Sequence, residues 1–372
     1  MAVCLDGYYG DNGFPMQARN VSRSVRRLAP VILFAVLAAC GSPVGEPASD
    51  GFGFEKTNRV ILELGPAGSF DETNAKYPCV LKVGSEWWMW YNGRSADSFT
   101  GQIGLATSPD GLSWTKANGG EPIFRHGPPG APDSTKVDHP AVVRFDGRFH
   151  MWFTMGDEDS SYTIGYATSE NGIDWTRRNQ GQPVLGTGEK GKFDDQVVLH
   201  PAVVRDDSGK LHLWYMGNGP QQGFRLGYAT SHDGIHWRRE NDGNPVVEPE
   251  TLGDITEEYV YNCMVLLEGE TFHMWYSAGT GIRSGEVVPR GNCIRHAVST
   301  DGVHWEKDRE PTLCNGPRGS IDEYAAFAPY VVRRDDGLWM YYSIGHIAEG
   351  PEGEDLRRFR TSLAKQVLDN DR

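Results

Sequence analysis

The feature that most constrains this chain is a repeated strand, turn and tryptophan. The copies lie at residues 103–114, 164–175, 226–237 and 294–305. Each copy has Asp-Gly or Asn-Gly before its tryptophan, which is the strongest short sequence signal for a β-hairpin. The tryptophans recur at intervals of about sixty residues, so one structural unit is repeated along the chain.

A second hairpin pattern precedes each copy and occurs once more near the C-terminus. Its first strand starts at a proline or a cysteine, at residues 78, 140, 201, 263 and 329. Its second strand is aromatic, at residues 88–91, 150–153, 212–215, 273–276 and 339–342. A proline-containing strand after each tryptophan gives four strands per unit. Four-stranded units at this period are typical of propeller blades. The sequence therefore predicts an all-β protein, a five-bladed β-propeller with four-stranded antiparallel blades.

The two ends of the repeat region complement each other. The fifth unit has no fourth strand of its own, but residues 60–72 match the fourth strand and following loop of another unit, residues 312–323. We expect residues 59–65 to pair with residues 359–364, so that the N-terminal strand closes the ring of a propeller spanning residues 59–368. Closure removes an open strand edge, which would invite aggregation.

The N-terminal region is typical of an export signal. Four arginines (Arg19, Arg23, Arg26 and Arg27) precede a short apolar run at residues 28–39, and the run ends at Cys40-Gly41, which resembles a bacterial lipoprotein signal. We interpret residues 1–40 as the signal region, with Met16 as the start, and residues 41–58 as a flexible tether. Cys40 is then the lipidation site, and the protein is exported and lipid-anchored in the bacterial cell envelope, in the periplasm or outer membrane. The alternative is an ordinary signal peptide, which also exports the chain.

The charge and the cysteines exclude two kinds of binding site and predict one disulfide. The net charge of −14 argues against nucleic-acid binding, which needs a basic surface. No Cys-x-x-Cys pair is present, so a structural zinc site is not expected. Cys293 begins a strand and Cys314 ends the adjacent one, which predicts a disulfide between them. Cys79 and Cys263 occupy equivalent positions in different blades and are expected to be free thiols.

The site is expected on the face where the first strand of each blade begins, because the loops there are long and differ between blades. The residue before each first-strand proline position is Tyr77, His139, His200, Asn262 or Ala328. Four of these five can form hydrogen bonds, and we interpret them as lining the mouth of a central funnel. The alternative is that each satisfies a backbone group of a neighbouring blade.

Carboxylates are frequent in the same loops. An aspartate recurs seven residues before the proline (Asp71, Asp133, Asp194 and Asp322), which favours a structural loop cap. Asp138, Asp195, Glu258 and Glu323 break or flank that repeat, so they are the catalytic candidates. For Asp138, the simpler alternative is a salt bridge with Lys136. No cofactor is expected, although His139 and His200 could hold a central metal ion with Asp138.

The Ala-Thr-Ser-x-Asp-Gly-x-x-Trp hairpin, as in residues 106–114, and the aromatic second strands resemble those of the five-bladed glycosidase superfamily, which contains glycoside hydrolase families 32, 43, 68 and 130. The resemblance covers residues 59–368. It implies funnel carboxylates that act as acid and base on a glycosidic bond. Families 32 and 43 place an aspartate directly before the first-blade proline, where this chain has Tyr77. Asp138, two residues before the second-blade proline, is the nearest match.

These observations predict an exported glycoside hydrolase acting on oligosaccharides or polysaccharides. The alternatives are a non-catalytic carbohydrate-binding propeller and, because the hairpin resembles a shortened Asp-box, a sialidase-like enzyme. The expected partner is a carbohydrate, and the chain is expected to be a monomer. Substrate contacts are expected from Asp71, Tyr77, Arg94, His139, His200, Tyr261 and Asn262.

Overall fold

The computed structural model describes residues 9–10, 14–15, 53–96, 100–159, 161–219, 223–253, 255–283, 291–349 and 355–367. Residues 16–40 of the expected signal region, with Cys40, and the tether as far as residue 52 lie outside these ranges. The short strands β1 (Tyr9–Gly10) and β2 (Phe14–Pro15) pair with each other. No helix among the described residues is long and apolar enough to cross a membrane. Their only helical segments are the single turns Asn118–Gly120, Asn179–Gly181 and Asn241–Gly243.

The described strands after residue 53 fall into five antiparallel groups, named here first to fifth. The first group is β4 (Asn74–Val83), β5 (Glu86–Arg94), β6 (Gln102–Ser108) and β7 (Thr115–Lys116). The second is β8 (Lys136–Phe145), β9 (Arg148–Gly156), β10 (Tyr162–Ser169) and β11 (Thr176–Arg177). The third is β12 (Val197–Arg205), β13 (Leu211–Asn218), β14 (Arg225–Ser231) and β15 (Arg238–Arg239).

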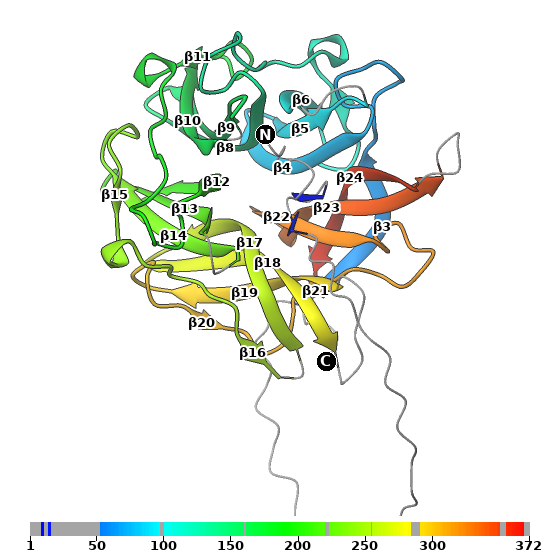
Figure 1. The fold of residues 1–372 in the computed structure, drawn as a ribbon. Coiled ribbons are helices and arrows are strands. Elements are labelled where there is room, and N and C mark those ends of the chain that lie inside the picture. Colours follow the sequence, from blue (N-terminus) through cyan, green and yellow to red (C-terminus); the bar gives the residue numbers. More distant parts are fainter. Residues whose placement is uncertain are drawn as a thin grey trace, which may run out of the picture. The chain divides into compact units, whose positions relative to one another are not determined.

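The last two groups follow the same order with two variations. The fourth is β17 (Ile255–Glu268), β18 (Thr271–Arg283), β19 (Gly291–Ser299), β20 (Glu306–Lys307) and β21 (Leu313–Cys314), with β16 (Thr251–Leu252) paired to β17. The fifth is β22 (Ala325–Arg334), β23 (Gly337–Glu349), β24 (Asp355–Gln366) and β3 (Phe54–Leu62). Figure 1 shows the first strands toward the middle of the molecule and the later strands farther out.

The fifth group combines the first and last strands of the repeat region, as the sequence predicted, although β3 covers residues 54–62 rather than the expected 59–65. β3 pairs antiparallel with β24, with Leu62 opposite Thr361 and Val60 opposite Ser362. The fifth group also packs against the first, because one hydrophobic cluster contains Val80 and Met89 together with Tyr341 and Leu363. A salt bridge of 2.6 Å between Lys56 and Asp322 further ties β3 to the loop that enters the fifth group.

Aromatic side chains of the second strands join neighbouring groups through one repeated hydrogen bond. The indole N–H groups of Trp90, Trp152 and Trp214 donate to the carbonyls of Gly172, Gly234 and Gly302 in the hairpin turn of the next group, at 2.9–3.0 Å. The Tyr341 hydroxyl makes the same contact from the fifth group to Gly111 of the first, at 3.1 Å. The turn glycine is required here: Gly234 has a φ of 76°, and a Cβ atom would lie 2.7 Å from the Trp152 ring.

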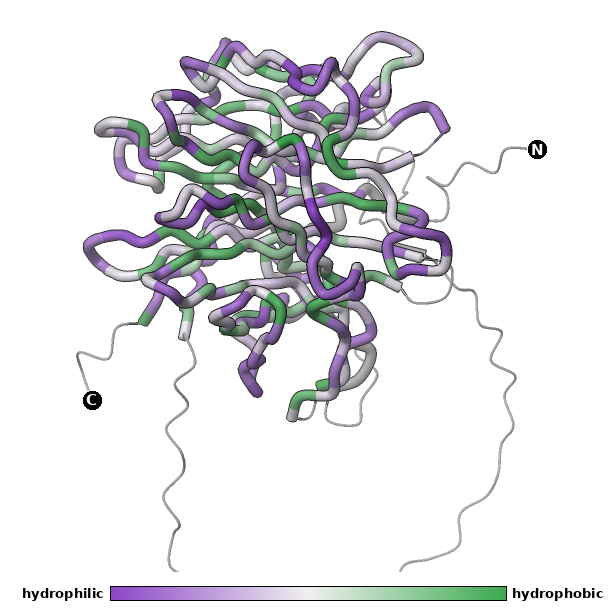
Figure 2. Tube along the Cα trace, turned by 90° about the vertical axis from the view of Figure 1, so that its left-hand side faces the viewer, coloured by the Kyte–Doolittle hydropathy of each residue, from purple (hydrophilic) through white to green (hydrophobic). Residues whose placement is uncertain are grey.

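The hydrophobic core lies between adjacent groups rather than in one layer. In one cluster, Trp90 and Leu105 of the first group pack against Val142 and Met151 of the second. Figure 2 shows hydrophobic residues along the strands and hydrophilic residues mainly in the connecting loops. Fully burying a large apolar side chain contributes about 1.5–3 kcal/mol, so packing between groups is a main source of stability.

The cysteine predictions are confirmed in the described chain. Cys293 on β19 lies directly opposite Cys314 on β21, and the two form a disulfide. Cys79 and Cys263 are buried free thiols.

Candidate functional site

The first strand of every group has a β-bulge at the residue that the sequence singled out. Tyr77, His139, His200, Asn262 and Ala328 have φ values of 58°, 48°, 54°, 44° and 50°. The strand register shifts at each of these positions. Left-handed backbone at a residue other than glycine costs about 1–3 kcal/mol, and such strain tends to occur at functional sites.

Neighbouring groups hold this backbone conformation at three of the bulges. Side-chain hydroxyls on the second strand of the preceding group accept the backbone N–H groups of Tyr77, His200 and Ala328, at 2.8–2.9 Å. The acceptors are Ser343, Thr154 and Ser277, respectively. At the second group the Asp138 carboxylate accepts the His139 N–H instead, at 2.7 Å. The backbone N–H groups of these four bulge residues are therefore satisfied without using their side chains, which leaves those side chains for another role.

The side chains at the bulges converge into one cluster, which we call the floor: Tyr77, His139, His200 and Asn262. The His139 and His200 rings stack with centroids 4.4 Å apart, and Tyr77 lies 4.6 Å and 5.2 Å from them. The Asn262 side chain lies close enough to Tyr77 and His200 to influence the pKa of both. The sequence predicted these residues to line the mouth of a funnel. Tyr77, His139 and Asn262 are instead buried and form its floor.

Several polar atoms of the floor have no hydrogen-bond partner. They are both ring nitrogens of His139, Nδ1 of His200 and Oδ1 of Asn262. Buried polar groups in proteins are nearly always satisfied, so unpartnered ones point to a water or a ligand. Tyr77 and His139 also line a small cavity of about 40 Å³, together with the residues that follow in the first strands, among them Pro78, Pro140, Pro201 and Pro329.

Burial keeps the floor uncharged at neutral pH. It lowers the pKa of His139 to about 3, with a further contribution from the nearby Lys76 ammonium. The pKa of His200 is also well below its usual value, first because of burial and then because of His139. Burial, followed by the Asp138 charge, raises the pKa of Tyr77 well above 10. The floor therefore offers neutral donors and acceptors, which suit sugar hydroxyl groups.

Asp138 is the predicted catalytic acid that the structure places at the floor. Its charge acts on the Tyr77 hydroxyl, and its side chain is partly exposed. The described residues show no ion pair between Asp138 and Lys136. Lys136 instead lies with its Nζ 3.4 Å from the Tyr162 hydroxyl. Simple strand alternation would separate Asp138 from His139, but the bulge interrupts that alternation.

Asp71 belongs to an ion pair that recurs in the groups. Its buried carboxylate accepts from the Tyr91 hydroxyl at 2.8 Å and pairs with Lys116 at 2.5 Å. Asp133 and Asp194 make the equivalent pairs with Arg177 and Arg239. The aspartate repeat therefore links the entry of each first strand to the outermost strand of its group. Asp71 was predicted to contact substrate, but these internal partners take up its carboxylate.

Asp195 and Glu323 belong to a second repeated contact, which they share with Glu72. Each carboxylate accepts the N–H of a glycine four residues earlier, namely Gly191, Gly319 and Gly68, at 2.6–2.7 Å. These loop caps explain why an acid follows the buried aspartate in three groups. Asp195 and Glu323 flank the recurring aspartate, as the sequence analysis noted, but they form a repeated structural contact of their own.

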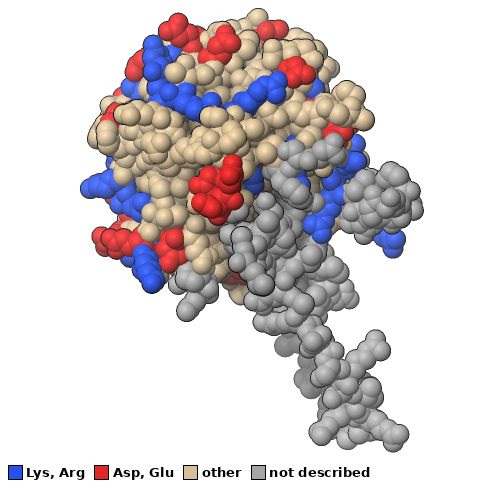
Figure 3. Space-filling view, turned by 45° about the horizontal axis from the view of Figure 1, so that its top comes forward, with Lys and Arg blue, Asp and Glu red and all other residues tan. Residues whose placement is uncertain are grey.

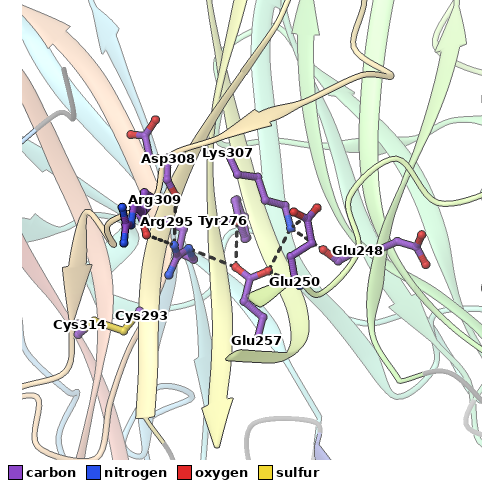
Figure 4. A network of polar contacts seen from close by, with 10 residues as sticks. All are labelled: Glu248, Glu250, Glu257, Tyr276, Cys293, Arg295, Lys307, Asp308, Arg309 and Cys314. Atoms are coloured by element: carbon purple, nitrogen blue, oxygen red, sulfur yellow. Dashed lines mark hydrogen bonds and ion pairs between the residues drawn. A yellow bond between two sulfur atoms is a disulfide. The ribbon is translucent and has the colours of Figure 1, made fainter. Parts of the chain in front are cut away.

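The fourth group replaces the recurring aspartate with Glu257, which the sequence analysis passed over. Glu257 pairs with the fully buried Arg295 at 3.2 Å and with Lys307 at 3.0 Å, and it accepts from the Tyr276 hydroxyl at 3.0 Å (Figure 4). The longer side chain reaches two cations, so this group carries the most extensive buried charge network among those described. Its neighbour Glu258, a predicted catalytic acid, is exposed at the surface.

The remaining predicted contacts surround the floor. Arg94 ends β5, and its charge acts on the Tyr77 hydroxyl. Tyr261 is buried and donates from its hydroxyl to Asn292 at 2.8 Å. Lys76, which the sequence analysis missed, lies between the Tyr77 and Phe359 rings, with its Nζ 4.7 Å and 4.6 Å from their centroids. The sequence could have indicated Lys76, because it lies two residues before the first-strand proline, as Asp138 does in the second group.

Two further features of the described part of the chain are the grouping of metal-binding residue types and the charge over one face. No group of three His, Cys, Asp or Glu side chains gathers there in a way that could hold a metal ion. Over the face in Figure 3, acidic and basic side chains are interspersed in small groups.

Comparison with known sequences gives distant relatives. No family model matches the chain. An uncharacterized protein of Mycobacterium tuberculosis is 24% identical over 255 residues, covering 66% of this chain and 80% of the relative. The sucrose-6-phosphate hydrolase of Escherichia coli is 23% identical over 297 residues, covering 71% of this chain and 59% of that enzyme.

Comparison with solved structures is more informative about the fold. A glycoside hydrolase superposes with a TM-score of 0.63 at 18% identity, covering 85% of this chain and 94% of the other. A family 117 glycoside hydrolase of Zobellia galactanivorans gives a TM-score of 0.62 at 17% identity, covering 86% and 92%. The expected resemblance is confirmed at the level of the fold: this chain has the nearly all-β architecture that these glycoside hydrolases share.

Proposed function

We propose that the five groups are the blades of one five-bladed β-propeller, and that the chain is a glycoside hydrolase with its active site above the floor. The observation that carries the proposal is the cluster of buried, neutral and partly unpartnered side chains beside Asp138. This cluster lies in a fold that solved glycoside hydrolases share.

The floor suits a sugar ring chemically. His139, His200 and Asn262 offer unpartnered nitrogen and oxygen atoms to sugar hydroxyls. Asp138 is the described carboxylate positioned to exchange a proton with a glycosidic oxygen or with water. Glycoside hydrolysis needs such a group for the leaving oxygen and a second one for water or the anomeric carbon.

The test is a screen of the purified protein on aryl glycosides and polysaccharides, followed by Asp138→Asn on the substrate found. We expect a loss of turnover of about a hundredfold or more with an unchanged melting temperature, because the variant removes an acid–base group and little packing. Glu258→Gln, which alters an exposed acid, should retain activity. Full activity in Asp138→Asn would overturn the assignment of Asp138 as the catalytic acid.

One observation favours a second function, non-catalytic carbohydrate binding. Among the described residues, Asp138 is the one carboxylate whose charge acts on a floor side chain, whereas hydrolysis needs two acids. Saturable oligosaccharide binding in calorimetry, with no product released after prolonged incubation, would support this alternative.

We also propose export and lipid attachment at Cys40, on the strength of the arginines, the apolar run and the cysteine-glycine junction. Expression with a radiolabelled fatty acid tests this proposal. We expect label in the natural protein and none in Cys40→Ser. A signal peptide without lipidation would give an exported, unlabelled protein in both cases.

A further inference from the structure

A second pocket lies at the turns of the fourth group, apart from the floor. Its volume is about 380 Å³, and its lining includes Thr271, Val298, Thr300, Trp305 and Glu306. Thr271 pairs with Glu268 where β17 turns into β18, whereas the floor residue Asn262 lies at the bulge in the middle of β17. Small-molecule sites have volumes of roughly 300–1,000 Å³, so this pocket has room for a sugar ring.

Trp305 gives the pocket a fixed aromatic wall. Its indole N–H donates to the Gly302 carbonyl at 3.1 Å, and its ring packs edge-to-face against Trp214 of the third group, with centroids 5.9 Å apart. The side chain is half-buried, so part of the ring surface remains open. Because these contacts already hold the ring, a ligand that stacks on it costs little side-chain entropy. A large apolar ring surface suits the C–H face of a sugar.

The second group has a pocket at the equivalent place, but its lining side chains pair with one another. Arg148, Thr168, Glu170 and Arg178 all line that pocket. The Arg178 Nε donates to the Thr168 hydroxyl at 2.7 Å, and Arg148 lies 3.6 Å from Glu170. The polar groups of the second-group pocket are therefore largely used within the protein.

The fourth group replaces the residues that make these contacts. Thr271 stands at the position of the first arginine, and Val298, which has no hydroxyl, stands at the position of the threonine. Asp308 stands at the position of the second arginine, but its carboxylate pairs with His296 at 3.0 Å. The pocket beside Trp305 is therefore not closed by pairs among its own side chains.

The polar side chains of this pocket are available to a ligand. Within the described residues, the side chains of Thr271, Thr300 and Glu306 form no hydrogen bond or ion pair. Two hydroxyls and a carboxylate beside an aromatic ring match the hydroxyl groups and the apolar face of a sugar. The lining contains no Lys or Arg, so an acidic sugar would find no cation there.

We propose that the pocket at Trp305 is a second carbohydrate site, which binds a neutral sugar ring stacked on Trp305. Thr271, Thr300 and Glu306 are the partners of its hydroxyl groups. The inference goes beyond the proposed function, because this site needs no catalytic group and shares no residue with the floor. On a polysaccharide, it holds a part of the chain that is not being cleaved.

Affinity electrophoresis of the full chain tests this proposal. The native gels contain a soluble neutral polysaccharide, namely a β-glucan, a mannan, a xylan or an arabinan, and mobility is referred to a gel without polysaccharide. We expect at least one of these probes to retard the natural protein. Thr271→Arg, which introduces the side chain that the second group carries at this position, should weaken the retardation fivefold or more. Glu86→Arg is the matched control, because it introduces the same side chain at the equivalent exposed position of the first group.

A second pair of variants removes the aromatic wall. Trp237 makes the same contacts in the third group as Trp305 does in the fourth, with a bond of 3.0 Å to Gly234 and an edge-to-face contact to Trp152. Trp305→Leu and Trp237→Leu should therefore lower the melting temperature to a similar extent, but only Trp305→Leu should weaken the retardation fivefold or more. Unchanged retardation in folded Thr271→Arg or Trp305→Leu overturns the proposal, and so does the absence of retardation by all four probes.

The outcomes separate this site from the proposed active site. Asp138→Asn should keep the retardation while it loses hydrolysis, and Thr271→Arg should keep the hydrolysis of a small aryl glycoside. Retardation that depends on Trp305, without hydrolysis of any glycoside, would remove the proposed enzyme and keep this inference. Hydrolysis together with retardation that is unchanged in Thr271→Arg would keep the enzyme and remove this inference.

Discussion

His139 combines a left-handed backbone with a buried imidazole whose ring nitrogens have no partner. Each of these features is unfavourable alone, and together they identify a residue held in place by its surroundings rather than by its own preference. The neighbouring His200 shares the backbone conformation and the depressed pKa. We therefore expect the His pair to be uncharged during function.

The first prediction concerns acid stability. In the unfolded chain His139 takes up a proton near its ordinary pKa of about 6.5, but in the folded protein only near pH 3. Between these values the unfolded state binds more protons, so the free energy of unfolding falls as the pH falls. For His139 the loss between pH 7 and pH 5 is about 2 kcal/mol.

Urea unfolding at the two pH values measures this effect. His139→Gln should lose about 2 kcal/mol less than the natural protein over this interval. His232→Gln, at an exposed histidine, should behave like the natural protein. Equal losses in His139→Gln and the natural protein would show that His139 already titrates normally when folded.

At the scale of the strand, one contact stabilises the bulges of three groups. A hydroxyl of the preceding group, from Ser343, Thr154 or Ser277, accepts the N–H of the bulge residue. The three bonds are alike, but they hold different side chains: a tyrosine, a histidine and an alanine. The bond from Ala328 to Ser277 therefore serves as a control, because it stabilises a bulge whose side chain is only a methyl group.

The second prediction uses this contrast. Thr154→Val and Ser277→Ala should each cost about 1–3 kcal/mol of stability, because each leaves a buried N–H without an acceptor. Thr154→Val should in addition weaken sugar binding tenfold or more, because His200 loses its fixed orientation, and Thr154→Ser should restore it. Calorimetric affinity and thermal melting separate the two effects. A similar loss of affinity in Ser277→Ala would show that Thr154 has only a structural role.

At the scale of the whole molecule, the N-terminal strand β3 completes the fifth group, and that group in turn packs against the first. The contacts of β3 span almost the whole described chain, such as the bond from the Thr57 hydroxyl to the Leu363 carbonyl, at 2.8 Å. Such distant pairing carries a large entropy cost of loop closure, which is expected to slow folding.

The third prediction is a deletion series read by thermal melting. Removing residues 41–65 should lower the melting temperature markedly or prevent folding. The deletion leaves the edge of β24 unpaired and removes Lys56, the partner of Asp322. Removing residues 41–52, which precede β3, should leave it unchanged. An unchanged melting temperature in the longer deletion would mean that β3 contributes no stability.

Residue types and spacing alone determined the strands, their grouping and several long-range pairs. The Asp-Gly turns and alternating strands are local signals, so the four repeated hairpins could be predicted, and matching the chain ends predicted the β3–β24 pair. The Cys293–Cys314 disulfide followed from the same strand order. Convergence of Tyr77, His139, His200 and Asn262 could be predicted from their equivalent positions.

The environment of each side chain was decided by the tertiary structure. The sequence separated the recurring Asp71 from the flanking Asp195 and Glu323, but only the fold shows that the first belongs to a buried ion pair and the other two accept glycine N–H groups. Glu257 stands where other groups have an aspartate, and it meets two cations from other strands of its group. The bulges, which no local signal marks, turn Asp138 and His139 toward the same cluster. Burial and partners come from residues distant in sequence, and these alone fix the charge and role of a carboxylate or an imidazole.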